Sequence, residues 1–168
     1  MTQQDIFVKW LSYSLLLVVL ALVNFFLLPA VPSLPLPLLL PSLAVAVGAL
    51  EGSRAGAGFG IVAGVVLGCL AHRPPLCIPA LSLAGWLSGL TTQYVLRRDL
   101  VGHTICALAV LLVWEGSALL GHLMGQTAPL QQLLRVAGPE LLASLVFTFP
   151  VYALAYFCCL HYGRMYHE

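Results

Sequence analysis

Charged side chains are scarce in this chain: they make up 8% of its 168 residues, whereas soluble domains carry about 25%. Hydrophobic residues make up 61%, and the mean hydropathy is +1.00. A formal net charge of +1 gives no basis for a nucleic-acid partner. The composition predicts an all-α polytopic membrane protein that is surrounded by the lipid bilayer.

Motifs of catalysis and metal binding are missing as well. The chain has no Ser-His-Asp pattern, no H-E-x-x-H sequence and no phosphate-binding G-x-x-x-x-G-K-[ST] sequence. Cys69, His72 and Cys77 lack the spacing of a four-ligand zinc motif. Five cysteines without paired spacing give no disulfide framework, although the adjacent Cys158 and Cys159 also suit S-palmitoylation. We therefore expect free thiols, no cofactor or metal, and no enzymatic activity.

Apolar segments long enough to cross a membrane, about 20 residues each, divide the chain. Five prolines between residues 29 and 41 predict a loop or a broken re-entry before a short second span. Polar residues predict a turn at 51–54 and a loop at 125–135. We expect a single transmembrane domain over 1–168 with six helices. Their approximate ranges are 6–28, 38–50, 55–70, 76–95, 101–124 and 138–160.

Lysine and arginine residues set the predicted orientation in the membrane. Only Arg73 and Arg135 fall on one side of the six predicted helices. The five cations on the other side are Lys9, Arg54, Arg97, Arg98 and Arg164. By the positive-inside rule, this asymmetry places both termini in the cytoplasm.

Glycines fall four residues apart from Gly48 to Gly68. Such a row of small residues lets two helix backbones approach closely inside a bilayer. The predicted turn at 51–54 divides the row, and a second small-residue face on the fourth helix is placed to receive the third. The candidate residues for helix packing and partner docking are Gly56, Gly60, Gly64, Gly68, Gly85 and Gly89.

Two polar residues interrupt the fifth predicted helix. Glu115 is near its middle, where inserting a carboxylate costs at least about 2.5 kcal/mol. His122 lies seven residues later on the same helical face. The sequence favours a polar contact that fixes helix packing over a role in binding an ion or substrate.

Four short motifs follow one another in a characteristic order. They are Gly60-Ile61-Val62-Ala63-Gly64-Val65-Val66-Leu67, Pro74-Pro75-Leu76 with Ala80-Leu81, Gly85-Trp86-Leu87-Ser88-Gly89, and Arg97-Arg98-Asp99. Over about residues 38–160, their order and spacing resemble the bacterial rod-shape-determining membrane protein family MreD. The resemblance implies a non-catalytic component, in the inner membrane, of the machinery that builds side-wall peptidoglycan and maintains rod shape. It also implies association with MreC and, through it, with MreB, RodA and its partner transpeptidase.

The small-residue faces motivate a mechanism, and the resemblance implies an alternative function. We hypothesise that the glycine row docks the membrane span of MreC. Family members often carry an aspartate where this chain has Gly68 and a glycine where it has Cys77, and loss of that acid weakens a transport role more than a scaffold role. The family's fold is similar to that of the substrate-binding subunits of energy-coupling-factor vitamin transporters. Such a subunit is the alternative, although the first helix here lacks its A-x-x-x-A docking motif.

Overall fold

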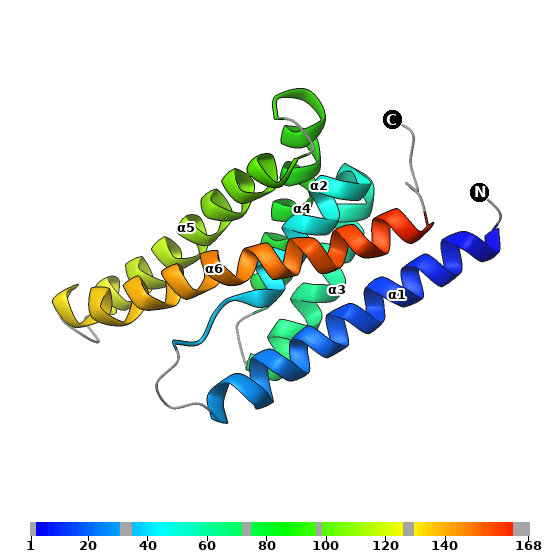
Figure 1. Ribbon diagram of the computed structural model, residues 1–168. Helices are drawn as coiled ribbons and strands as arrows, with labels where there is room; N and C mark the ends of the chain where they lie inside the picture. Colours follow the sequence, from blue (N-terminus) through cyan, green and yellow to red (C-terminus); the bar gives the residue numbers. More distant parts are fainter. Residues whose placement is uncertain (1–2, 31–34, 72–74, 97–98, 126–129, 163–168) are drawn as a thin grey trace.

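The protein is described by a computed structural model over residues 3–30, 35–71, 75–96, 99–125 and 130–162. Every regular element among these residues is helical (Figure 1). The helices are α1 (Gln3–Leu22), extended by a π-helical turn (Val23–Leu27) and a 3₁₀ turn (Leu28–Ala30), α2 (Leu39–Glu51), α3 (Ser53–Ala71), α4 (Cys77–Tyr94), α5 (Leu100–Met124) and α6 (Leu130–Tyr162). The predicted all-α class is therefore confirmed.

Four described helical segments are long and apolar enough to cross a membrane. They are 6–30, 53–71, 100–124 and 130–160. Helix α2 is apolar but has only 13 residues, and α4 is not among the four. The membrane character of the chain agrees with these segments, whereas the count of six crossings stays a prediction.

The last helix differs most from the sequence prediction. It begins at Leu130 rather than at residue 138, so the predicted polar loop at 125–135 is wrong over its second half. Pro139, the second residue of the predicted range, lies inside the helix, as does Pro150. The residues from Leu130 to Leu134 are leucines and glutamines, which are good helix formers, and they extend the helix beyond the proline. The starts of α2 to α5 agree with the prediction within two residues.

Helix α2 is the centre of the bundle. All 13 of its residues are buried, and it contacts α1, α3, α4, α5 and α6 (Figure 1). Its length is about 20 Å, which is short of the roughly 30 Å hydrocarbon core. The chain reaches it through non-helical residues 35–38, and the Leu38 N–H donates to Ser144 Oγ at 2.8 Å. This bond satisfies a backbone group that lipid leaves without a partner.

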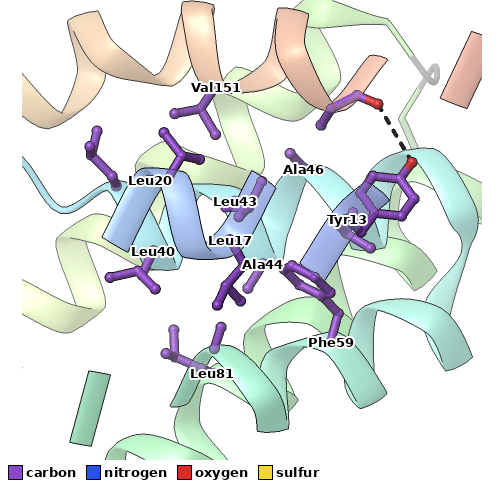
Figure 2. Packing of buried hydrophobic residues seen from close by; sticks show 14 of the residues in the cluster. Tyr13, Leu17, Leu20, Leu40, Leu43, Ala44, Ala46, Phe59, Leu81 and Val151 are labelled. Carbon is purple, nitrogen blue, oxygen red and sulfur yellow. Dashed lines mark hydrogen bonds between the residues drawn. The ribbon is translucent and has the colours of Figure 1, made fainter. Parts of the chain in front are cut away.

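One hydrophobic core joins α1, α2, α3, α4 and α6. Figure 2 shows Leu17 and Leu20 of α1 beside Leu43 of α2, with Phe59 of α3 and Val151 of α6 around them. All five side chains are buried. Helix α5 packs separately, through Cys106 and Ala107 against Val45 of α2. Helix α5 is therefore held mainly by α6 and α2, and less by α4.

A single residue, Gly52, joins α2 and α3. Glu51 ends α2 and Ser53 begins α3, so the predicted four-residue turn is shorter than expected. Gly52 has φ 106° and ψ 173°, a region that is essentially restricted to glycine. The two helices are thus connected by a turn that depends on this residue type.

We expect Gly52→Ala to lower the free energy of unfolding by about 2 kcal/mol, because alanine at this φ and ψ is strained. Thermal unfolding of the purified protein in detergent measures the loss. Gly58→Ala is the matched control, since an added Cβ at Gly58 meets nothing within 4 Å. Equal melting temperatures for the two variants would contradict the strain argument.

Candidate functional site

The glycines of α3 lie directly against the backbone of α4. A Cβ added at Gly56 would lie 2.4 Å from Gly85 O, and one at Gly60 would lie 2.3 Å from Leu81 O. Gly64 is similar, with Ile78 Cα at 2.6 Å. These separations leave no room for a side chain. Helices α3 and α4 therefore approach backbone to backbone, as small residues allow.

The glycines of α4 complete this contact, and α2 closes it from the other side. A Cβ at Gly85 would lie 2.2 Å from Gly56 O, and one at Gly89 would lie 2.5 Å from Ser53 Cα. A Cβ added at Gly48 of α2 would also lie 2.2 Å from Gly85 O. We call Gly56, Gly60, Gly64, Gly85 and Gly89 the glycine seam.

The glycine seam is an internal contact of this chain. Gly56, Gly60 and Gly64 are buried, and α4 occupies the face on which a partner helix was expected to dock. Gly68 is half-buried, and its added Cβ would meet only Cys77 Sγ, at 3.4 Å. A partner helix has no access to this row unless α4 is displaced, so a docking surface has to lie elsewhere.

Side-chain hydrogen bonds reinforce the packing of α4. Ser88 Oγ donates to Val45 O of α2 at 3.3 Å, and Ser82 Oγ donates to Ala57 O of α3 at 3.1 Å. Thr92 Oγ1 reaches Ala49 O of α2 at 3.4 Å. These bonds join α2, α3 and α4 into one unit.

A buried ion pair joins the beginning of α1 to the end of α2. Lys9 Nζ lies 2.5 Å from Glu51 Oε1, and the Tyr13 hydroxyl donates to the same oxygen at 2.7 Å. The side chains of Lys9 and Glu51 are 0% exposed. Lys9 is therefore buried inside the protein and paired with a carboxylate, rather than exposed as expected of a topology cation.

Sequence reasoning missed this pair, although a signal was present. Lys9 stands inside an apolar segment, and Glu51 is the only acid between residues 6 and 98. A buried cation requires a partner, so this acid was the natural candidate. Of the other predicted topology residues, Arg54 is exposed near this pair, while Arg97, Arg98 and Arg164 lie outside the described residues.

Glu115 and His122 lie toward one end of the bundle. Trp114, next to Glu115, lines a cavity of about 180 Å³ together with Pro29 and Ala71, which are at the ends of α1 and α3. Glu115 is half-buried and His122 is exposed. Glu115 is the sixteenth of the 25 residues of α5, and its neighbour Trp114 lies at the level where α3 ends.

An open groove of about 790 Å³ lies between α4 and α5. Helix α4 lines it with Ala80, Ala84 and Ser88, which are four residues apart. Ala109, Val113 and Ser117 of α5, also four apart, line the opposite wall. At one end, Thr91 Oγ1 and Cys106 Sγ close the groove with a 3.1 Å contact.

The groove runs along most of the length of α4. From Cys77 to Thr91 on α4 it covers 15 residues, a rise of about 21 Å. Val113 is 73% exposed on its wall. The hydroxyls of its lining bond to backbone carbonyls of the chain itself, Thr91 to Leu87 O at 2.9 Å and Ser117 to Trp114 O at 2.8 Å. The groove therefore offers shape and apolar surface rather than polar ligands.

The part of the chain that the structure describes contains no group of three His, Cys, Asp or Glu side chains that could hold a metal ion. All five cysteines are free thiols. Comparison with protein-family models, with curated proteins and with solved structures finds no match to this chain.

Proposed function

We propose that the chain is a non-catalytic scaffold of the bacterial cell-elongation machinery, and that its α4–α5 groove binds the transmembrane helix of MreC. The groove is the observation that carries this proposal, because it is open, apolar and as long as most of a membrane-spanning helix. The cell-elongation machinery is inferred from the order of the motifs, which resembles that of the MreD family. Through MreC, the chain would associate with MreB, RodA and its partner transpeptidase.

The lining of the groove suits a helix better than a small polar molecule. Small residues at Ala80, Ala84 and Ala109 allow the backbone of a docked helix to come close, and van der Waals packing drives association within lipid. A vitamin site needs several convergent polar groups. Because Thr91 and Ser117 already bond to their own helices, the groove favours the scaffold over the energy-coupling-factor alternative.

In this proposal all six helices stand in the inner membrane with both termini in the cytoplasm. The start of α1 and the end of α6 lie at one end of the bundle, where the Tyr13 hydroxyl contacts Ala155 O at 3.5 Å. Arg54 is exposed near that end. The short α2 is enclosed by its neighbours, so its limited length leaves no backbone facing lipid.

Filling the groove tests the proposal. Ala80 and Ala109 are exposed on its walls, so Ala80→Trp with Ala109→Trp fills it without entering the core. We expect at least tenfold less MreC to co-purify with this variant, and loss of rod shape in cells that depend on it. Ala153→Trp is the control, because Ala153 is exposed on α6 away from the groove. Undiminished recovery of MreC, at an unchanged melting temperature, would refute the proposal.

A further inference from the structure

The cavity of about 180 Å³ beside Trp114 is a second site, distinct from the α4–α5 groove. Residues far apart in the chain bound it: Phe25 of the π-helical turn, Pro37 of the segment before α2, Leu67 of α3 and Trp114 of α5. We call it the small cavity. Pockets for drug-sized ligands measure roughly 300–1,000 Å³, whereas a cavity of about 150 Å³ holds benzene. The small cavity therefore suits a ligand of about six non-hydrogen atoms.

An amide oxygen without a hydrogen bond belongs to the wall of the small cavity. Asn24 lines the cavity and is only 7% exposed. Its Oδ1 has no hydrogen-bond partner within the described part of the chain. In native proteins nearly all buried polar side-chain atoms make at least one hydrogen bond, to the protein or to a molecule held by it. Asn24 Oδ1 is therefore placed to accept a hydrogen bond from a molecule inside the cavity.

The backbone at Asn24 also departs from the regular α-helix. Val23–Leu27 form a π-helical turn, and the Leu28 N–H donates to Val23 O, five residues earlier. Turns of this kind occur within α-helices frequently at functional sites. Two independent irregularities, one of the backbone and one of the side chain, thus coincide at Asn24.

Water alone matches the walls of the small cavity poorly. A buried water requires two to four polar partners. Asn24 and Glu140 are the described lining residues that carry side-chain oxygens, and most of the others are aliphatic, among them Leu36 and Leu67. A molecule with one polar end and one apolar end therefore fits these walls better than a group of waters does.

The side chains at the polar end select a hydrogen-bond donor. The amide oxygen of Asn24 and a carboxylate at Glu140 both accept hydrogen bonds, so the ligand has to donate them. A carboxylate also attracts a cation, as does the face of an indole ring such as that of Trp114. A primary ammonium has three N–H donors and a positive charge. Leu67 and Pro37 are then available to cover a short alkyl chain.

We propose that the small cavity binds a primary ammonium group that carries a short alkyl chain, with Asn24 Oδ1 and the Glu140 carboxylate as its hydrogen-bond acceptors. A free amine and the headgroup of phosphatidylethanolamine both present this chemistry. The site is an addition to the scaffold function, and it does not depend on what occupies the groove.

Three probes of equal chain length test the proposal: butylammonium, 1-butanol and butyrate. They are added to the full chain, purified in an uncharged detergent without MreC. Trp10→Phe with Trp86→Phe leaves Trp114 as the only tryptophan, so its fluorescence reports on the small cavity. We expect butylammonium to bind at least tenfold more tightly than the other two, and to raise the melting temperature of the chain with all three tryptophans. Equal affinities for the three probes, or no response to butylammonium, overturn the proposal.

Substitution of Asn24 separates this site from binding elsewhere. Asn24→Leu replaces the amide with an apolar side chain of similar size, and it should weaken butylammonium binding at least tenfold. Without amine, the melting temperature should stay the same or rise, because a buried oxygen without a partner is removed. Gln93→Leu is the matched control, since Gln93 is a half-buried amide on α4 outside the small cavity. Unchanged binding by Asn24→Leu overturns the proposal.

Glu140→Gln tests the charge at the polar end of the cavity. This change keeps the shape of the side chain and removes its negative charge, so butylammonium should bind at least tenfold more weakly while butanol binding stays the same. Equal losses for the two probes would show that Glu140 acts on the cavity through its shape alone, and would overturn its role as an acceptor for the ammonium.

Two membranes distinguish the sources of the ammonium group. The protein is placed in vesicles of phosphatidylglycerol alone, or of phosphatidylglycerol with an equal part of phosphatidylethanolamine. If the lipid headgroup occupies the cavity, the apparent affinity for butylammonium should fall at least tenfold in the mixed vesicles, and Asn24→Leu should abolish this difference. Equal affinity in the two membranes assigns the site to free amines. Both results support the ammonium site and differ only in the source of the ligand.

Discussion

Lys9→Met should lower the free energy of unfolding by about 3–5 kcal/mol, because it leaves the Glu51 carboxylate buried without its cation. Both side chains are 0% exposed, so water cannot replace the missing partner. In a chain of this size, a loss of 3 kcal/mol corresponds to a fall of about 6–12 °C in melting temperature. Thermal unfolding of the purified protein in detergent measures it.

A double-mutant cycle isolates the contribution of the ion pair. Glu51→Gln removes the stranded charge, so Lys9→Met with Glu51→Gln should recover most of the stability that Lys9→Met alone loses. Tyr13 then still has an amide oxygen to which it can donate. Tyr13→Phe alone should cost about 2 kcal/mol, the scale of a hydrogen bond to a charged group. If the double variant is as unstable as Lys9→Met, charge burial is not the cause.

Gly85→Ala should destabilise the protein by about 3 kcal/mol, at the upper end of the usual cost of overpacking. The added Cβ would lie 2.2 Å from Gly56 O and 2.7 Å from Gly56 C. Both atoms belong to the backbone of α3, which cannot move aside without shifting the whole helix. The melting temperature in detergent should fall, and the protein should become more sensitive to protease.

Gly116→Ala is the matched control for this change. Gly116 is a glycine inside α5, and an added Cβ there meets nothing within 4 Å. Alanine is favoured over glycine in a helix by up to about 1 kcal/mol, so this variant should be as stable as the parent or more so. If Gly85→Ala and Gly116→Ala behave alike, the close approach of α3 and α4 is contradicted.

The local pattern of the sequence was sufficient to predict the helices but not to predict what packs against each of them. Glycines four residues apart predict that two backbones come close, yet the pattern is the same whether the second backbone belongs to this chain or to a partner. The path of the chain decides between these two cases. Here α2, which is joined to α3 at Gly52, and α4 cover the glycine face of α3.

The groove was beyond sequence reasoning for a different reason. The groove depends on how α4 and α5 diverge from the contact between Thr91 and Cys106, which is a long-range property of packing. The first eight residues of α6 were missed because Gly138-Pro139 is typical of a helix start, whereas α6 begins at Leu130.

The enclosure of α2 has a consequence for how the protein is made. A 13-residue segment is too short to remain across a bilayer by itself. We expect α2 to enter the membrane together with α3, as a hairpin bent at Gly52. Until Glu51 emerges from the ribosome, α1 lies in the membrane with Lys9 not yet paired to that carboxylate. Biogenesis would then have a vulnerable interval, between synthesis of α1 and arrival of α2, in which a membrane insertase or chaperone is most needed.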